Sequence, residues 1–150
     1  LTQQWAKADP QIVRGYLQDP ASRQLPDDLV SAAVRQWMGK DAAGTLDWLA
    51  KVPENRRGEA VESAFSELAR DNPAMAAAEF EQRSAIATPG AAKNIASSWF
   101  RSDQNAAISW AASLPEGPAR GKVLEGLKEQ ADFEVRLGGT FPESLKKLLP

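Results

Sequence analysis

The chain has 150 residues, of which 43% are hydrophobic and 25% charged, and this length is enough for one domain with a substantial core. A net charge of −2 gives no general attraction to nucleic acid or anionic membranes, and no apolar run approaches the roughly 18 residues of a membrane span. Cysteine and histidine are absent, which excludes disulfides, thiolate chemistry and imidazole bases or metal ligands. Because both cytosolic and exported proteins can lack cysteine, a cytoplasmic and an exported or periplasmic location both stay open.

One sequence frame recurs along the chain: a large residue, an Asp or Asn four or so places later, and a second aromatic residue. It is clearest in WMGKDAAGTLDW and WFRSDQNAAISW, and weaker in WAKADPQIVRGY and LARDNPAMAAAEF. The four copies begin at Trp5, Trp37, Leu68 and Trp99. These positions lie 32, 31 and 31 residues apart, and a degenerate fifth copy is expected near Ala131. Such regular spacing predicts a repeat protein.

Each copy predicts a hairpin of two helices. Apolar residues stand three, four and seven places before the first position of the frame, which defines one face of an α-helix. They are Val30, Ala33 and Val34; Val61, Ala64 and Phe65; and Ala92, Ile95 and Ala96. Asp9, Asp41, Asn72 and Asp103 are then expected to cap a second helix. That helix is expected to end at Val52-Pro53 and at Leu114-Pro115, because proline disfavours helix at the residue before it.

The two tryptophans of the clearest copies, Trp37 with Trp48 and Trp99 with Trp110, are expected to close their hairpins, one from each helix. A single hairpin cannot bury its apolar face, so the copies should stack. The sequence therefore predicts an all-α fold: a right-handed αα-superhelix, or short solenoid, of about four hairpins within residues 1–131. The first copy lacks its leading helix, which suggests a fragment or domain of a larger protein.

This pattern resembles the bacterial helical-repeat proteins of the tetratricopeptide-like and HEAT-like class, at the level of organisation and over residues 1–131. The period is shorter than the roughly 34 residues of the tetratricopeptide repeat, and the Leu-Gly expected soon after the first Trp is missing. No specific family is assigned. The resemblance implies a binding scaffold for proteins or peptides.

Residues 132–150 depart from the repeat. Phe133, Val135 and Leu137 alternate with charged residues, which predicts a strand, and Gly138-Gly139 follows as a turn signal. The stretch PESLKKLLP then predicts a short helix. This segment is expected either to cap the last repeat or to dock a partner.

Two arginines, Arg57 and Arg120, recur near the start of a helix, where a cation meets the helix dipole unfavourably. We expect each to pack across its loop onto a Trp or to hydrogen-bond loop carbonyls; recognition of an anion is the alternative. No Gly-rich phosphate loop, hydrolase elbow or metal-binding spacing is present, and we expect neither a catalytic residue nor a cofactor or metal.

The faces of the first helices supply the candidate partner-binding residues. Polar and often small side chains occupy matching slots one, two and six places before the frame: Arg35, Gln36, Glu62, Ser66, Lys93, Ser97 and Ser98. If these helices line a concave groove, their small side chains leave room for a bound segment; an ordinary solvated face is the alternative. The predicted function is a non-catalytic scaffold for a protein or peptide, within a larger bacterial protein. The alternative is a small-ligand-binding or enzymatic domain that uses Arg, Asp or Glu.

Overall fold

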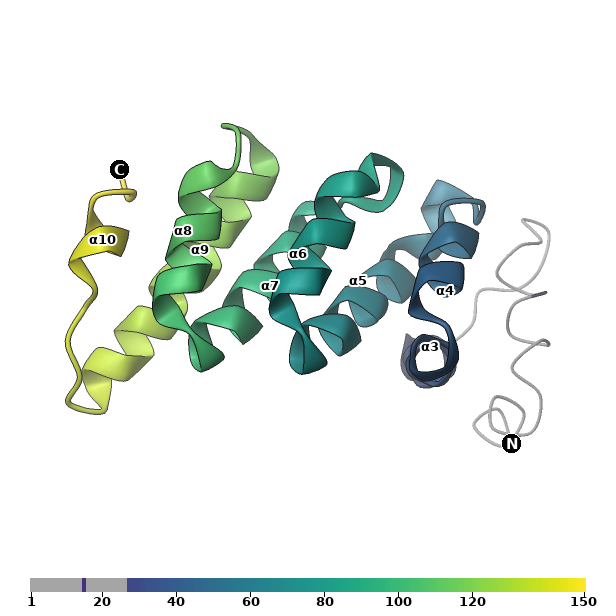
Figure 1. The fold of residues 1–150 in the computed structure, drawn as a ribbon, viewed down its shortest axis with the longest axis horizontal. Helices are drawn as coiled ribbons and strands as arrows, with labels where there is room; N and C mark the ends of the chain where they lie inside the picture. The colour runs from purple at the N-terminus through teal and green to yellow at the C-terminus, as the bar shows by residue number, and fades with distance from the viewer. Residues whose placement is uncertain (1–14, 16–26) are drawn as a thin grey trace. The chain divides into compact units, whose positions relative to one another are not determined.

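The computed structural model of the chain describes Gly15 and residues 27–150 (Figure 1). Eight α-helices with defined bounds and one short 3-10 helix, η1, form the regular structure of this part, which contains no strand. They are α3 (Asp27–Lys40), α4 (Ala42–Leu49), α5 (Glu54–Asp71), α6 (Pro73–Gln82), η1 (Ser84–Ile86), α7 (Pro89–Ser102), α8 (Gln104–Ser113), α9 (Pro118–Arg136) and α10 (Glu143–Lys146). The predicted all-α class is confirmed. The first copy of the frame, with Trp5 and Asp9, lies outside the described residues.

The chain divides into two compact units, Leu1–Leu68 and Ala69–Pro150. In the first unit, α3 and α4 form a hairpin in which the Trp37 and Trp48 rings meet edge to face, with centroids 5.2 Å apart. Beside this hairpin, the Ser31 hydroxyl on α3 donates a hydrogen bond to Glu59 Oε1 at 3.1 Å and lies 2.7 Å from the Ser63 hydroxyl. Both partners belong to α5, so polar contacts accompany the packing of α3 on α5.

In the second unit, α7 lies among α6, α8 and α9 and contacts all three (Figure 1). The tryptophans of this copy again face each other across a hairpin, with the Trp99 and Trp110 ring centroids 6.1 Å apart. Phe80 of α6 also meets Trp110 edge to face, with the ring centroids 6.0 Å apart. The predicted closing of both hairpins by paired tryptophans is confirmed.

Each second helix of these copies begins at the capping residue that the sequence predicts. The carboxylate of Asp41 accepts a hydrogen bond from the Gly44 amide at 2.9 Å, and that of Asp103 accepts one from the Ala106 amide at 3.1 Å. The side-chain oxygen of Asn72 accepts a hydrogen bond from the Met75 amide at 3.1 Å. All nine apolar residues that precede the frame are buried: Val30, Ala33, Val34, Val61, Ala64, Phe65, Ala92, Ile95 and Ala96. Capping and burial therefore follow the repeat in all three described copies.

The strand predicted at Phe133, Val135 and Leu137 is wrong, because α9 continues through Arg136. In the other copies the first helix stops at an Asp or Asn four places after the start of the frame, whereas Val135 stands at that place after Ala131 and cannot cap. The helix ends at a glycine cap instead. Gly138 has φ of +97°, and the Gly139 amide donates to the Glu134 carbonyl at 2.8 Å.

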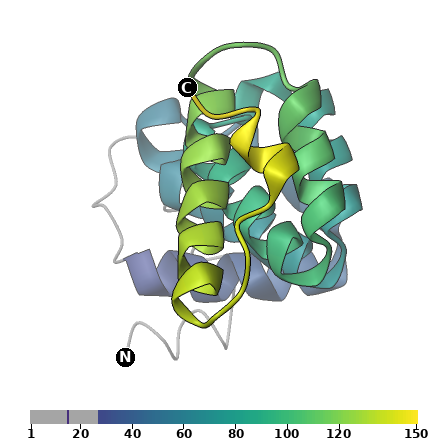
Figure 2. The same cartoon turned by 90° about the vertical axis from the view of Figure 1, so that its left-hand side faces the viewer.

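The last helix, α10, is a single turn that lies across the α8–α9 pair (Figure 2). Its Leu145 side chain is fully buried, whereas Phe133 and Leu137 near the end of α9 are largely exposed. The short helix predicted in PESLKKLLP is confirmed, and its leucine contributes to the core of the second unit.

Candidate functional site

The recurring arginines bind the chain's own backbone. Arg57 Nη1 donates to the carbonyls of Ala50 and Val52, at 3.3 and 3.1 Å. Arg120 Nη1 donates in the same way to the carbonyls of Ala112 and Leu114, at 3.4 and 2.8 Å. These carbonyls are equivalent in the repeat, and they lie close to the end of the second helix or just beyond it. The predicted hydrogen bonding of loop carbonyls is confirmed at both sites.

The predicted partner-binding residues of the first unit differ in exposure. Arg35 and Gln36 on α3 are exposed, whereas Glu62 and Ser66 on α5 are half-buried. Burial, together with the neighbouring carboxylate of Glu59, raises the pKa of Glu62 above its ordinary value. A negatively charged group of a partner that contacts this face of α5 would therefore be disfavoured.

On α7 the predicted partner-binding residues lie against other helices. Lys93 Nζ lies 3.6 Å from Glu125 Oε1 and 3.4 Å from Glu129 Oε1, both on α9. A Cβ added to Gly126 of α9 would come within 2.9 Å of Ser97 Oγ. Ser97 therefore lies where α7 and α9 approach each other closely.

Ser98, the third of these residues, points to a different neighbour: its hydroxyl donates to the Ala69 carbonyl at 3.4 Å. Glu125, which pairs with Lys93, also forms an ion pair with Lys122 of α9. The hydrogen bond and charge of Lys122, together with the charge of Lys93, lower the pKa of Glu125 below its ordinary value. All three α7 residues are half-buried and have contacts within the second unit. Binding of a partner there stays a prediction, and it applies to side chains that already have neighbours.

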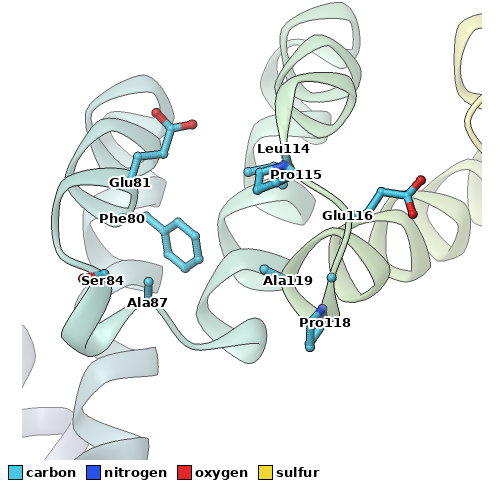
Figure 3. Close-up of a pocket in the computed structure, with 10 residues that line it drawn as sticks. Phe80, Glu81, Ser84, Ala87, Leu114, Pro115, Glu116, Pro118 and Ala119 are labelled. Carbon is cyan, nitrogen blue, oxygen red and sulfur yellow. The ribbon is translucent and has the colours of Figure 1, made fainter.

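A cavity of about 350 Å³, which the sequence did not predict, opens on the second unit. One wall is formed by the end of α6 and by η1, and the other by the loop from α8 to α9 (Figure 3). Phe80 projects its ring between the two walls. Ten residues line it: Phe80, Glu81, Ser84, Ala87, Leu114, Pro115, Glu116, Gly117, Pro118 and Ala119.

The loop wall is held in one conformation by its own sequence. Pro115 and Pro118 restrict φ at two of its positions, and Gly117, between them, has φ of +153°, which favours glycine. Pro118 occupies the first turn of α9, where its missing N–H leaves no hydrogen bond unmade. The guanidinium of Arg120 fixes the start of the loop through the Leu114 carbonyl.

The wall formed by α6 and η1 is tied in a comparable way. Arg83 Nε lies 2.6 Å from Glu79 Oε2, and Ile86 of η1 is fully buried. Next to Phe80, the carboxylate of Glu81 accepts a hydrogen bond from Trp110 Nε1 at 3.0 Å. This bond joins α6 to α8 directly beside the cavity, so the site is connected to the aromatic pair that closes the hairpin.

The chemistry of the cavity is that of an apolar slot with acidic margins. Glu81 and Glu116 are its charged lining residues, one on each wall, and Figure 3 shows both carboxylates directed outside the cavity. Such a slot can hold an apolar group and place a cation at its edge. Its lining residues do not include a nucleophile paired with a base. Within the described residues, no group of three or more Asp and Glu side chains is arranged to hold a metal ion.

One signal in the sequence marks this cavity. When the two clearest copies are aligned, the loop after Pro115 is one residue longer than the loop after Pro53, and it carries Gly117-Pro118. In the first copy α5 begins directly at Glu54. The extra residue lengthens the loop that forms one wall of the cavity. The opposite wall, at η1, is not marked by any feature of the repeat.

No model of a known protein family matches the chain, and no curated protein or solved structure is significantly similar to it. In the part of the chain that the structure describes, none of the helices combines the length and apolar character needed to cross a bilayer.

Proposed function

We propose that the protein is a non-catalytic scaffold of helical repeats, a right-handed αα-superhelix of about four hairpins that binds a protein or peptide. The resemblance to tetratricopeptide-like and HEAT-like repeats implies this scaffold role, which the chain would perform within a larger bacterial protein. The bound segment would run along several repeats, because each first helix offers only a narrow strip.

One observation carries this proposal: the polar residues that recur with the repeat are bound to backbone groups. Asp41 and Asp103 cap helices, and Arg57 and Arg120 bind carbonyls at the loops that follow them. In an enzyme, a recurring pair of acids and arginines would be expected to converge on a cavity. Here the repeated residues stabilise hairpins, which supports a scaffold.

The test uses exposed residues of the predicted binding face. The purified chain serves as bait to capture partners, and each identified partner is then titrated against Arg35→Glu combined with Gln36→Glu. We expect this variant to lose at least tenfold in affinity while its helicity and melting temperature stay at the parent values. Ser97 is unsuitable for the test, because a larger side chain there would collide with α9 at Gly126.

The matched control is Arg101→Glu combined with Gln104→Glu, which makes the same charge change at exposed positions outside the predicted face. This control should bind like the parent. Equal losses in both variants would show a general charge effect and contradict a site on α3. If no captured protein binds the purified chain directly, the scaffold proposal fails.

A further inference from the structure

We propose that the cavity between η1 and the α8–α9 loop binds one large apolar side chain of a peptide, flanked on the peptide by Lys or Arg. This inference rests on the proposed function and assigns it a specific site. The occupant is thus a cationic peptide segment with an aromatic or leucine side chain as its anchor.

The interior of the cavity fits an apolar anchor. Its volume of about 350 Å³ lies at the lower end of the range of ligand sites, and its inner lining is Phe80, Leu114, two prolines and two alanines. Phe80 presents its ring to the cavity (Figure 3), so an inserted aromatic ring can pack against it edge to face. A charged or strongly polar group would lose its hydration there without a matching partner.

The margins of the cavity determine the charge of the occupant. Glu81 lies on the α6 wall and Glu116 on the loop wall, and no Lys or Arg is among the ten lining residues. Both carboxylates point outward from the rim of the cavity (Figure 3), so they would act at its edge on the residues that flank an inserted side chain. Basic residues on either side of the anchor would therefore be attracted, and acidic residues would be repelled.

The walls are already in place before binding. The two prolines, the Arg120 hydrogen bond and the Glu79–Arg83 ion pair hold both sides of the cavity. A preformed site avoids the entropic cost of ordering loops when the peptide binds. A single inserted residue gives only a weak contact, which agrees with a scaffold that gains affinity from several repeats at once.

The indole N–H of Trp110 provides a local reporter, because it donates to Glu81 and its ring contacts Phe80. Its NMR resonance is identified by its loss in Trp110→Phe. We titrate the protein with the blocked peptide Gly-Ser-Arg-Phe-Arg-Ser-Gly, and expect a saturable shift of this resonance while those of Trp37 and Trp48 stay in place. The peptides with Glu-Phe-Glu or Arg-Ala-Arg at the centre should bind at least tenfold more weakly.

Two sets of variants locate the site. Ala87→Leu and Ser84→Leu each fill the cavity and should weaken the Arg-Phe-Arg peptide at least tenfold, whereas Ala78→Leu, at an exposed α6 position outside the lining, should not. Glu81→Gln with Glu116→Gln keeps the shape of the side chains and should reduce affinity about threefold to tenfold. Its control is Glu54→Gln, which changes the equivalent of Glu116 in the first copy.

The proposal is overturned if the peptides with Arg-Phe-Arg and Glu-Phe-Glu bind equally, or if Trp37 and Trp48 respond in place of Trp110. It is also overturned if both filling variants bind like the parent, or if only small neutral aromatic compounds bind. In each of these cases a captured partner that still depends on Arg35 would keep the scaffold function. The absence of any direct partner, with the peptide results as expected, would instead remove the scaffold and leave the cavity site.

Discussion

Asp103 accepts a hydrogen bond from the Ala106 amide and so satisfies one of the free N–H groups at the start of α8. Replacing it with Ala should lower the free energy of unfolding by about 1 kcal/mol. Asp103→Asn retains a side-chain oxygen at the cap and should lose much less. Urea unfolding of both variants measures the difference, and equal losses would show that the carboxylate charge, and not the cap, stabilises this end.

Burial and the charge of Glu59 raise the pKa of Glu62 in the folded state. We therefore expect the stability of the protein to depend on pH. The folded protein then holds this proton more tightly than the unfolded chain does. The stabilisation is fully present below the ordinary pKa of a Glu and is lost as pH rises through the raised value.

Glu62→Gln keeps the size of the side chain and removes this titration. It should melt at a higher temperature than the parent at pH 7 and lose that advantage near pH 3.5, where the parent Glu62 is protonated. Thermal melting of Glu62→Gln and of the parent across this pH range measures the difference. A constant difference between Glu62→Gln and the parent across this range would contradict the prediction.

At single positions, local chemistry was predictable and tertiary neighbours were not. The capping role of Asp41 and Asp103 follows from their place before a helix, and the role of Arg120 from its unfavourable place near a helix start. Because Lys93 is polar and Ser97 is small, the sequence favours placing both on a binding face. The sequence did not show that Gly126 of α9 would approach them, since that contact joins residues about thirty places apart.

Each hairpin depends on its paired aromatic residues. Trp48 and Trp110 are 6% and 7% exposed, and both sit between the two helices of their copy. Trp48→Ala or Trp110→Ala should lower the free energy of unfolding by about 3–5 kcal/mol, because each leaves a large cavity. Chemical denaturation measures the change. Trp110→Phe keeps a ring against Phe80 and should cost much less; if Trp110→Ala melted like the parent, the packing role would be wrong.

Gly121 and Gly126 of α9 allow the effect of helix propensity on stability to be distinguished from the effect of helix packing. A Cβ added at Gly121 meets nothing within 4 Å, so Gly121→Ala should stabilise the protein by about 0.5–1 kcal/mol. Gly58, its equivalent in α5, should behave alike. A Cβ at Gly126 would lie 2.9 Å from Lys93 Cγ, so Gly126→Ala should gain less. Urea midpoints compare the three variants, and an equal gain at Gly126 would contradict the close packing of α7 on α9.

The boundaries of the elements show where sequence patterns are ambiguous. Alternation over Phe133 to Leu137 suited a strand, yet residues four apart in the same run also share one helix face. The absence of an Asp or Asn at Val135 favoured continuation of α9, and Gly138 then ended it. A short run of alternating residues therefore predicts less than the presence or absence of a cap.

For the whole molecule, the proposed superhelix makes a prediction about size in solution. A compact domain of this length has a radius of gyration of about 15 Å. Hairpins stacked in one direction give a longer particle, so small-angle X-ray scattering should yield a clearly larger radius and an asymmetric distance distribution. A radius of about 15 Å at several protein concentrations would contradict the stacked arrangement and favour a globular bundle.

The helical class, the hairpins, their caps and their paired tryptophans could all be predicted from the order of the amino acids. These features depend on residues within about twelve places of one another, and the same spacing recurs at Trp37 and Trp99. The packing of the folded chain was needed to show that Lys93 and Ser97 face α9, and that η1 and the α8–α9 loop form a cavity beside Phe80. Both results require segments about thirty residues apart to meet, and a repeat period does not specify which side chains then come into contact.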